Sequence, residues 1–383
     1  MKRVLLLLAT QGAAGRGFSR GIAQASAFER PWIFEIRHVL EADYSWILSH
    51  DMDGCIVEAH DRSLLDILGK TGKPVVNLTS LESAFPTIQY DERAVGFMAA
   101  EYFSARGFRR FACIYRDDRP NERRRKEGFI AWLESHGLSG TTIKIESSET
   151  RQGLQDYRKP IARIINALQK PTAIFCTADY IGIWITEVCY GEGIQVPEHL
   201  AILGVDNDEI LCNLTHPPLS SIAVPQEPAG AYALEILGYL LRGRSHPKLR
   251  LLNPLGVVTR QSTDLFATDD PDLAMALRFI SDHADQPINL PDIFKAVMVS
   301  RRSLERRFLA KLGRTPAEEV RRVHLERAKT LLVATDWPIA MVAEKSGFSS
   351  AIWMSSVFRK QLNVTPAAFR RRATVTVHGP KTP

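Results

Sequence analysis

Two segments near the C-terminus, 290–312 and 339–362, share a pattern of a short helix, a tight turn and a second helix rich in polar residues. Each ends in a similar phrase, Leu-Gly-Arg-Thr-Pro at 312–316 and Leu-Asn-Val-Thr-Pro at 362–366. This repeat restricts the last hundred residues to an all-α fold with two helix-turn-helix units. Because the second helix of such a unit can lie in the major groove, the repeat predicts contact with two faces of duplex DNA.

Charge is distributed unevenly along the 383 residues. Residues 301–372 contain 16 Lys and Arg against 6 Asp and Glu, whereas residues 1–299 are net acidic and the whole chain is only +6. A basic block on an acidic body indicates a polyanionic partner for that block. The alternative is that these cations only solvate helix faces, and it is weaker because several of them cluster at helix starts.

The cysteines and the N-terminal residues indicate the cellular compartment of the protein. The five cysteines contain no CxxC pair, so we expect neither a metal site nor a disulfide framework, and a reducing cytoplasm fits them. Residues 1–8 resemble a signal peptide, but their apolar core is short for one, and a buried first strand explains them equally well. No window approaches the roughly 20 apolar residues of a membrane span, so we expect no membrane partner.

The first 265 residues alternate short β-rich runs with helical patterns. Continuous apolar runs such as 173–176 and 201–205 suit strands buried on both faces, and the alternation predicts parallel, doubly wound sheets. We expect two such sheets, one before about Arg106 and one from about Phe108 to Ser221. The predicted organisation is a two-lobed α/β domain over 1–265, a linker over 266–270, an all-α domain over 271–372 and a tail over 373–383.

The second helix of the first unit is expected to begin after Ser300, whose hydroxyl can accept a bond from a free backbone N–H. Its polar face lies opposite the apolar positions 304, 308 and 312. Arginine can pair bidentately with guanine, which is worth about 1–3 kcal/mol of discrimination, while other arginines would hold phosphates. The candidate DNA-binding residues of this unit are Ser300, Arg301, Arg302, Ser303 and Arg306.

In the second unit, Gly347 is expected to form the tight turn. The helix after it is expected to bury Trp353 together with residues 357, 358 and 362. Its outer face has no long hydrogen-bonding side chain, although small apolar groups there could meet thymine methyls, so we expect less base information from this unit. The candidate DNA-binding residues are Ser350, Ala351, Ile352 and Ser355.

Residues 270–372 resemble the DNA-binding domain of the AraC family of transcription regulators. The matching phrases lie at 290–293, 300–308, 325–332, 339–343, 347–349, 357–360 and 365–370. The resemblance implies a long helix over about 317–334 that joins the two units. The sequence departs from the family at Asn363, where glycine is usual, and at 350–352, which are less polar than is typical.

Polar side chains follow several predicted strands of the α/β domain. Asp206 comes directly after the strand at 200–205, Asp179 lies just past the strand that ends near 176, and Arg125 opens a helix after another strand. Ligands of open α/β sheets bind at the carboxyl ends of the strands. Carboxylates and a forked arginine suit the hydroxyls of a sugar. The alternative is that the two aspartates only cap helices.

A glycine-rich stretch at 10–18 follows the first strand. It lacks GxGxxG, and the chain contains no YxxxK, so we expect no nucleotide cofactor there. A competing interpretation of the whole chain is a solute-binding protein or enzyme-like α/β domain whose helical tail binds a protein. The chain shows no catalytic constellation, and its basic helix faces favour DNA.

Residues 196–208 and 220–233 resemble the sugar-sensing domain of LacI-type repressors, which has the two-lobed fold of periplasmic sugar-binding proteins. The resemblance covers most of 1–265 and implies that Arg125, Asp179 and Asp206 contact a ligand. LacI-type repressors carry their DNA-binding domain at the N-terminus, whereas here it lies at the C-terminus.

A LacI-type domain followed by an AraC-type domain resembles the arrangement of xylose-responsive regulators. It implies a cytoplasmic, homodimeric regulator of pentose catabolic genes that takes xylose or a related sugar as effector. Its operator DNA would be double-stranded. Resemblance to the AraC family also implies activation, with a contact to RNA polymerase.

Overall fold

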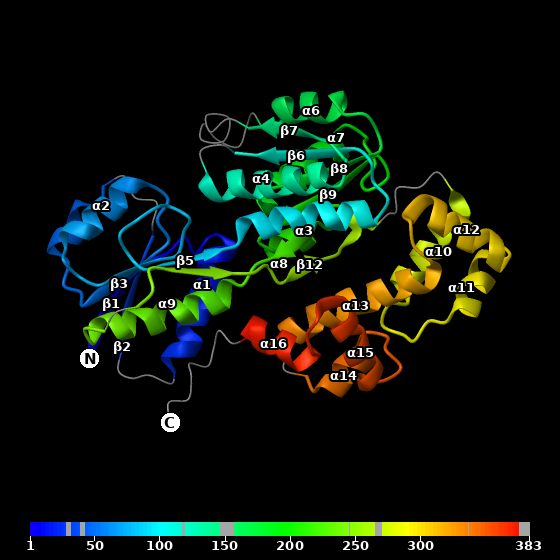
Figure 1. Ribbon diagram of the computed structural model, residues 1–383. Coiled ribbons are helices and arrows are strands. Elements are labelled where there is room, and N and C mark those ends of the chain that lie inside the picture. The colour runs from blue at the N-terminus through cyan, green and yellow to red at the C-terminus, as the bar shows by residue number, and fades with distance from the viewer. Residues whose placement is uncertain are drawn as a thin grey trace.

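The structure is a computed structural model, which describes residues 1–27, 32–38, 43–116, 119–145, 157–244, 246–264, 270–335 and 337–374. Two α/β lobes are followed by a helical domain (Figure 1), which confirms the predicted architecture. The expected linker at 266–270 lies outside the described residues except for Asp270. Of the expected tail at 373–383, everything after residue 374 lies outside them as well.

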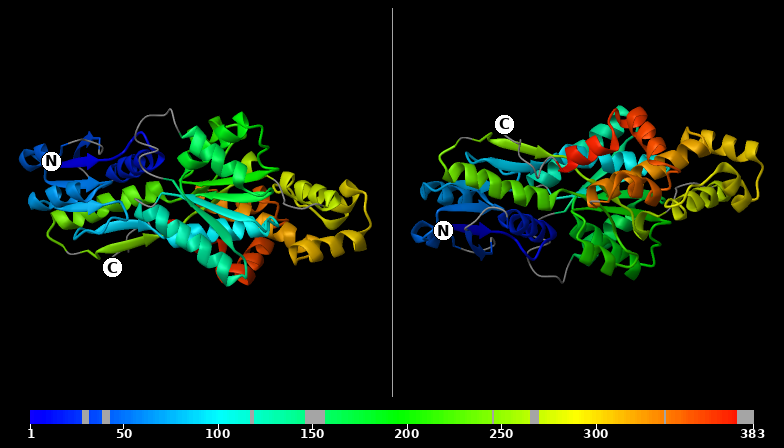
Figure 2. Two further views of the ribbon diagram at one scale, coloured as in Figure 1. Left: turned by 90° about the horizontal axis from the view of Figure 1, so that it is seen from above. Right: turned by 90° about the horizontal axis from the view of Figure 1, so that it is seen from below.

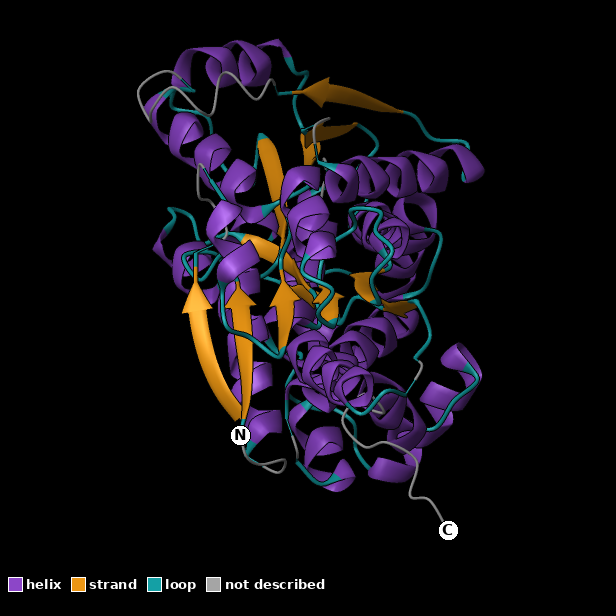
Figure 3. Cartoon of the chain, turned by 90° about the vertical axis from the view of Figure 1, so that its left-hand side faces the viewer, coloured by secondary structure: helices purple, strands orange, loops and turns teal. Residues whose placement is uncertain are grey.

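The first lobe is built on a six-stranded sheet in the order β11-β5-β4-β3-β1-β2, and its paired strands are parallel (Figure 3). Alternate residues of β1 point to opposite faces, as a strand requires. Val4 and Leu6 pack under helices α1 and α9, whereas Leu5 and Leu7 pack under α2. The elements are β1 (Lys2–Leu7), α1 (Ala13–Ser26), β2 (Trp32–Arg37), β3 (Gly54–Val57), α2 (Arg62–Lys70), β4 (Val75–Asn77), β5 (Thr87–Tyr90), α9 (Gln226–Leu241) and β11 (Leu249–Leu252).

The second lobe has a six-stranded sheet in the order β12-β10-β9-β8-β6-β7, parallel except for the β10–β12 pair. Helices α3 and α4 cover one face, and α6 and α7 cover the other. The elements are α3 (Glu92–Ala105), β6 (Phe111–Tyr115), α4 (Pro120–Ser135), β7 (Gly140–Lys144), α6 (Arg158–Ala167), β8 (Thr172–Cys176), α7 (Asp179–Gly191), β9 (Leu200–Val205), α8 (Glu209–Leu214), β10 (Ser220–Ala223) and β12 (Gly256–Val258).

The two expected sheets are present, but the chain divides between the lobes differently from the expected boundary near residue 106. Helix α3 precedes that boundary and nevertheless packs on the second sheet. After β10 the chain returns to the first lobe for α9 and β11, and then crosses again to add β12. Apolar periodicity identifies a buried helix face but does not say which sheet covers it, so the sequence left these crossings open.

Helices α3 and α4 touch backbone to backbone. A Cβ atom on Gly96 of α3 would lie 2.0 Å from the carbonyl oxygen of Arg125, and a Cβ on Gly128 of α4 would lie 2.2 Å from that of Arg93. Reciprocal glycines therefore permit the close crossing, which makes α3 and α4 a single stiff layer.

The helical domain has two apolar cores that share one long helix, α13. Val320 and Val323 of α13 pack in the first core, whereas Leu325, Ala328 and Leu332 pack in the second. The helices are α10 (Pro271–Asp282), α11 (Leu290–Val297), α12 (Arg301–Leu312), α13 (Pro316–Ala334), α14 (Ile339–Lys345), α15 (Ala351–Leu362) and α16 (Pro366–Thr374). Figure 2 shows this domain beside the second lobe.

The expected helix ends of both units are confirmed. The Ser300 hydroxyl accepts from the backbone N–H of Ser303 at 3.3 Å, and Ser350 caps α15 in the same way. Gly347 has φ +76° in the turn, and Asn363 takes the left-handed conformation after α15 with φ +53°. Asparagine tolerates that conformation better than most residues, so it can stand where glycine is usual.

The expectation that Trp353 is buried is wrong. Its side chain is 44% exposed, and Met354 fills the core in its place, together with Val357 and Phe358. Residues 354, 357 and 358 lie on one face at i, i+3 and i+4, which rotates Trp353 toward solvent. The apolar residues at 351–354 fit more than one helical stripe, so periodicity alone did not select the correct one.

We predict that Gly96→Ala destabilises the α/β domain by about 1–3 kcal/mol or more, because the new methyl group would meet backbone atoms that cannot move aside. The measurement is the thermal unfolding midpoint by circular dichroism. Gly191→Ala, at the end of α7, is the matched control because no atom lies within 4 Å of its added Cβ. Equal midpoints for the two variants would disprove the close crossing.

Candidate ligand site and DNA-binding surface

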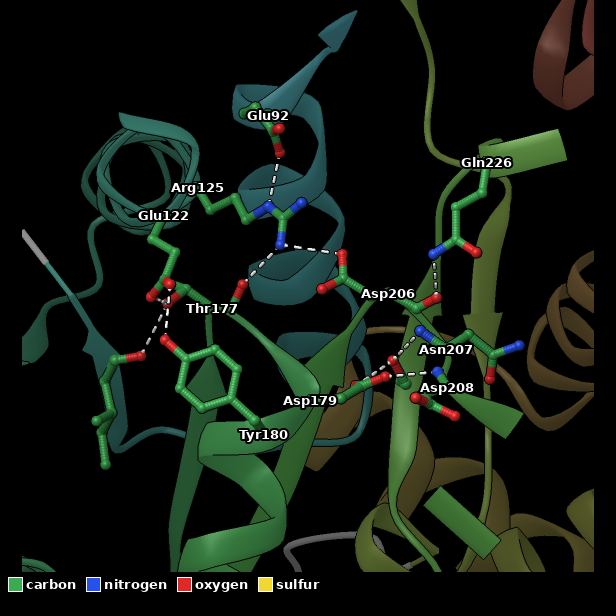
Figure 4. Close-up of polar contacts among 12 residues, drawn as sticks. Glu92, Glu122, Arg125, Thr177, Asp179, Tyr180, Asp206, Asn207, Asp208 and Gln226 are labelled. Carbon is green, nitrogen blue, oxygen red and sulfur yellow. Dashed lines mark hydrogen bonds and ion pairs between the residues drawn. The ribbon is translucent and has the colours of Figure 1, made fainter. Parts of the chain in front are cut away.

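Arg125 is the centre of a buried polar network at the strand ends of the second lobe (Figure 4). It lies in the second turn of α4, rather than at its start, and is 2% exposed. Its Nε donates to Glu92 Oε2 at 2.6 Å and its Nη1 donates to the Thr177 carbonyl at 2.7 Å. Nη1 also lies 3.3 Å from Asp206 Oδ1. The guanidinium thus connects the start of α3 with the ends of β8 and β9.

Electrostatics keep this guanidinium charged. Burial lowers the pKa of Arg125, but the carboxylates of Glu92 and Asp206 outweigh burial and raise it overall. Glu122 braces the same region, since it accepts from the Thr177 hydroxyl at 2.7 Å and from the Tyr180 hydroxyl at 2.8 Å. Glu122 therefore helps to hold Thr177, whose carbonyl accepts from Arg125.

Asp206 is held in a backbone conformation that non-glycine residues rarely adopt, with φ +104°. Its N–H donates to the Ile222 carbonyl at 3.0 Å, and its own carbonyl accepts from Gln226 Nε2 at 2.9 Å. Burial raises the pKa of Asp206 to about 6, although Arg125 opposes the shift. Backbone strain held from both sides is typical of functional positions, and here it directs the carboxylate toward Arg125.

Asp179 supports the loop that carries Asp206. Its Oδ1 accepts from the Ser221 hydroxyl at 2.6 Å, and its Oδ2 accepts from the Asp208 backbone N–H at 2.7 Å. Burial and the nearby Asp206 raise the pKa of Asp179 to about 7. The Asp179 side chain does not cap its own helix, because the α7 cap position is Ala178. Direct contact between Asp179 and a ligand stays a prediction.

The first lobe contributes polar residues that the sequence analysis did not identify. Glu58 follows β3 and is buried, and its Oε2 accepts from the Ala9 N–H at 2.9 Å. Burial raises the pKa of Glu58 to about 7, and Asp206 adds to that effect. His60 lies next to it, with Nδ1 2.9 Å from Arg119 Nη1, and burial together with Arg119 lowers its pKa to about 4.

Tyr90 is the second group that was missed, at the end of β5. Its hydroxyl is buried and has no hydrogen-bond partner among the described residues. Burial raises the pKa of Tyr90, and the charges of Asp206, Glu92 and Glu58 act in the same direction. A buried hydroxyl that lacks a partner among the described residues is a group that a polar ligand could satisfy. The position of Tyr90 at the end of a strand of the first sheet was the available signal, because open α/β sheets in general bind ligands at that edge.

Side chains from the two lobes meet directly around these groups. Arg16 of α1 donates to Asp208 Oδ2 at 2.7 Å, and Arg124 of α4 donates to Gln89 Oε1 at 3.2 Å. These contacts are polar and include charged partners, so water can replace them when the lobes separate. A ligand that satisfies groups of both lobes would therefore favour the closed arrangement.

The helical domain exposes the candidate DNA-binding residues of α12. Arg302 and Arg306 are exposed, and Arg301 pairs with Glu305 at 2.8 Å on the same surface. Ser300 is exposed and Ser303 is partly buried. Arg307 faces elsewhere, because its Nη1 binds the carboxylate of Asp270 at 2.6 Å.

Helix α15 exposes a less polar surface. Ile352 is 84% exposed and Ser350 is exposed, whereas Ala351 and Ser355 are partly buried. With Trp353 also exposed, the start of α15 presents an unexpectedly apolar surface. Base contact by the candidates in both helices stays a prediction.

A buried ionic group joins the helical domain to the second lobe. Glu319 of α13 is fully buried and pairs with Arg314 and with Arg322, the latter at 2.7 Å. Arg314 also donates to the carbonyl of Ala105, the last residue of α3. Next to it, the Arg106 guanidinium lies 3.6 Å from the centre of the Tyr102 ring. The C-terminal end of α3 is therefore part of the domain interface.

The described part of the chain shows neither a metal-ligand cluster nor a membrane-spanning helix. No group of three or more His, Cys, Asp or Glu residues there could hold a metal ion. None of the helices described combines the length and apolar character needed to cross a bilayer.

Two family models match the chain. A periplasmic binding protein-like domain matches residues 100–263, and a helix-turn-helix domain matches residues 293–372. The sequence is 27% identical to the xylose operon regulatory protein of Escherichia coli over 380 residues, which cover 96% of each chain. It is also 27% identical to the protein of the same name from Haemophilus influenzae, over 83% of this chain and 85% of that one.

Solved structures agree with the whole architecture. A structure described as the xylose-binding transcription activator xylR matches with a TM-score of 0.62 and 26% identity, over 96% of this chain and 97% of that one. A periplasmic binding protein/LacI transcriptional regulator from Alkaliphilus metalliredigens, complexed with D-xylulofuranose, matches 69% of this chain and 99% of its own with a TM-score of 0.58. Its 17% identity supports the fold of the α/β domain alone.

The raised pKa of Asp179 predicts a pH-dependent stability. The folded chain holds a proton between the ordinary pKa of 3.8 and about 7, where the unfolded chain has released it. The stability from this proton is complete below the lower value and is lost as the pH rises toward 7. Asp179→Asn cannot titrate, so its thermal midpoint should rise relative to that of the unsubstituted chain from pH 5 to pH 8.

The exposed Asp66→Asn in α2 is the control for this experiment, and its offset from the unsubstituted chain should stay constant over the same pH range. A constant offset for Asp179→Asn as well would show that Asp179 titrates normally.

Proposed function

We propose, on the premise that this chain is an AraC-type helix-turn-helix regulator homologous to the xylose operon regulatory proteins, that it controls pentose catabolic genes in response to xylose. The observation that carries the proposal is the similarity to regulators named for xylose, which extends over 96% of the chain and includes both the α/β and the helical domain. A related pentose is the alternative effector, because xylose is inferred from the names of the related regulators and the polar groups of the site would suit other pentoses as well.

The sugar site that we propose lies between the strand ends of the two lobes. Asp206 would accept bonds from sugar hydroxyls, and Arg125 would donate to a hydroxyl or to the ring oxygen. Tyr90 and Glu58 would complete the contacts from the first lobe, and the buried Tyr90 hydroxyl would gain the partner that it lacks among the described residues. Asp179 would act mainly by holding the Asp206 loop.

Helix α3 is the element through which we propose that the sugar acts on DNA binding. Glu92, at its start, binds Arg125 in the sugar site, and Ala105, at its end, accepts a bond from Arg314 of the helical domain. Its 14 residues span about 20 Å at 1.5 Å per residue. Since α3 crosses α4 in backbone contact, a shift of Arg125 would move α3 as a rigid body and change the surface that α13 meets.

The proposed DNA contacts follow from the exposed faces of the two units. Arg302 and Arg306 of α12 would contact base edges or phosphates, and the apolar start of α15 would contact thymine methyls. Binding should therefore weaken with added salt, because phosphate contacts release counterions.

The proposed assembly is a cytoplasmic homodimer that binds two half-sites. Closure of the lobes around the sugar would shift the dimer arrangement and so the fit to the half-sites. Activation is supported by the similarity to a structure described as a xylose-binding transcription activator. We propose that it would act through a contact with RNA polymerase.

The first experiment measures thermal stabilisation of the purified chain by a panel of pentoses and hexoses. Xylose at about 100 times its dissociation constant should add roughly 2.7 kcal/mol of stability. Asp206→Ala should remove the shift but leave DNA binding without sugar intact, whereas the exposed Asp66→Ala should change neither. A selective shift with another sugar would replace the effector, and no shift with any sugar would refute the sugar site.

The second experiment tests the α3 route with Glu319→Gln, which leaves Arg314 and Arg322 without their buried carboxylate. DNA affinity is measured by fluorescence anisotropy with and without sugar. The ratio of the two affinities, which expresses the coupling between the sites, should fall toward one while sugar affinity stays unchanged. Glu326→Gln is the matched control, since its carboxylate pairs within α13 with Lys329. An unchanged ratio in Glu319→Gln would exclude this interface from the response.

A further inference from the structure

A buried histidine lies between the two cores of the helical domain. His324 is in the middle of α13, directly after Val323 of the first core and directly before Leu325 of the second. Its side chain is 5% exposed. The two helix-turn-helix units are therefore joined along one helix, and His324 marks the boundary between their cores.

His324 lies between the chain that leads into the first unit and the turn of the second unit. Gln286 lies in the connection between α10 and α11, and Gly347 forms the turn between α14 and α15. A Cβ on Gly347 would lie 2.5 Å from His324 Nε2 and 2.6 Å from the Gln286 carbonyl oxygen. The imidazole, the carbonyl and the bare Cα therefore crowd one point. The Phe348 ring adds an edge contact, 5.6 Å from the imidazole between centroids.

Hydrogen bonding holds this side chain only weakly. His324 Nε2 is buried and has no hydrogen bond of good geometry among the described residues, although the Gln286 carbonyl faces it closely enough to act on its pKa. A buried polar atom without a well-made hydrogen bond destabilises a fold. Burial lowers the pKa of His324 to about 4, with the Gln286 carbonyl opposing the shift, so the ring is neutral at ordinary pH. The main role of the His324 ring is therefore steric, because its flat shape fills the space between the two units.

We propose that His324 is a positioning residue which fixes the angle between the two helix-turn-helix units, so that α12 and α15 enter the major groove at a single spacing. The inference rests on the proposed DNA-binding function. Two recognition helices on one rigid domain reach segments about one helical turn of DNA apart, roughly 10–10.5 base pairs. An angular change between the units would alter the spacing that fits.

The effect of DNA spacing on affinity distinguishes a positioning role of His324 from a role in stability alone. A bound duplex is first enriched from random sequences with the full-length chain, and the two contacted segments are located by footprinting. Duplexes with one base pair inserted or deleted between these segments are then compared by fluorescence anisotropy. The unsubstituted chain should lose about tenfold or more in affinity for either duplex, the cost of a serious mismatch.

Three variants are compared on these duplexes. His324→Ala should bind the original duplex more weakly, yet lose less than about threefold on insertion or deletion. His324→Gln extends as far as Nε2 and should restore the discrimination. Leu273→Val damages the first core at the start of α10, the end of that helix away from Gln286, so it should weaken binding to all three duplexes by the same factor.

Full discrimination by His324→Ala, or equal loss of discrimination in Leu273→Val, would overturn the positioning role while DNA binding itself stands. If the unsubstituted chain enriches no duplex at all, the DNA-binding function fails, and the positioning role fails with it.

Discussion

Burial of the Arg125 guanidinium is the constraint on which the α/β domain depends. Removing this cation from water costs several kcal/mol unless carboxylates and carbonyls surround it. Glu92, Thr177 and Asp206 supply them from α3, β8 and β9. Since each partner lies at the end of a different element, satisfying one charge fixes where three elements meet. The same requirement explains why Asp206 keeps an unfavourable backbone conformation.

Interfaces within the molecule are of two physical kinds. Helices α3 and α4 interlock through Gly96 and Gly128, where displacement would open a void against backbone atoms. The lobes meet through pairs such as Arg16–Asp208, and the helical domain meets the second lobe through Arg314 and Glu319. The partly exposed contacts between the lobes can exchange with water at modest cost, whereas packed backbone and the buried Glu319 carboxylate cannot. We therefore expect the lobes to move against each other at their polar contacts, with the packed layer of α3 and α4 moving as one body.

Sequence patterns predicted those features that depend on residues close together in the chain. The cap at Ser300 and the strands buried on both faces follow from neighbouring residues, and Arg125 and Asp206 were predicted as ligand contacts from their positions after strands. Long-range packing decided the rest. Alternative apolar stripes left the register of α15 open, so Trp353 was misplaced. Tyr90 was missed because the same strand-end rule was not applied to the first lobe, and its environment comes from residues distant in sequence.

The crossings of the chain between the lobes have a consequence for biosynthesis. The first sheet is completed by β11, and α1 packs against α9, whose backbone would lie 1.9 Å from a Cβ on Gly21. Neither lobe is contained in a continuous N-terminal stretch, because the first needs residues up to 252 and the second needs residues up to 258. Many proteins complete their domains in order as they leave the ribosome. In this chain both lobes must wait for nearly the same stretch to emerge, so they mature together and late.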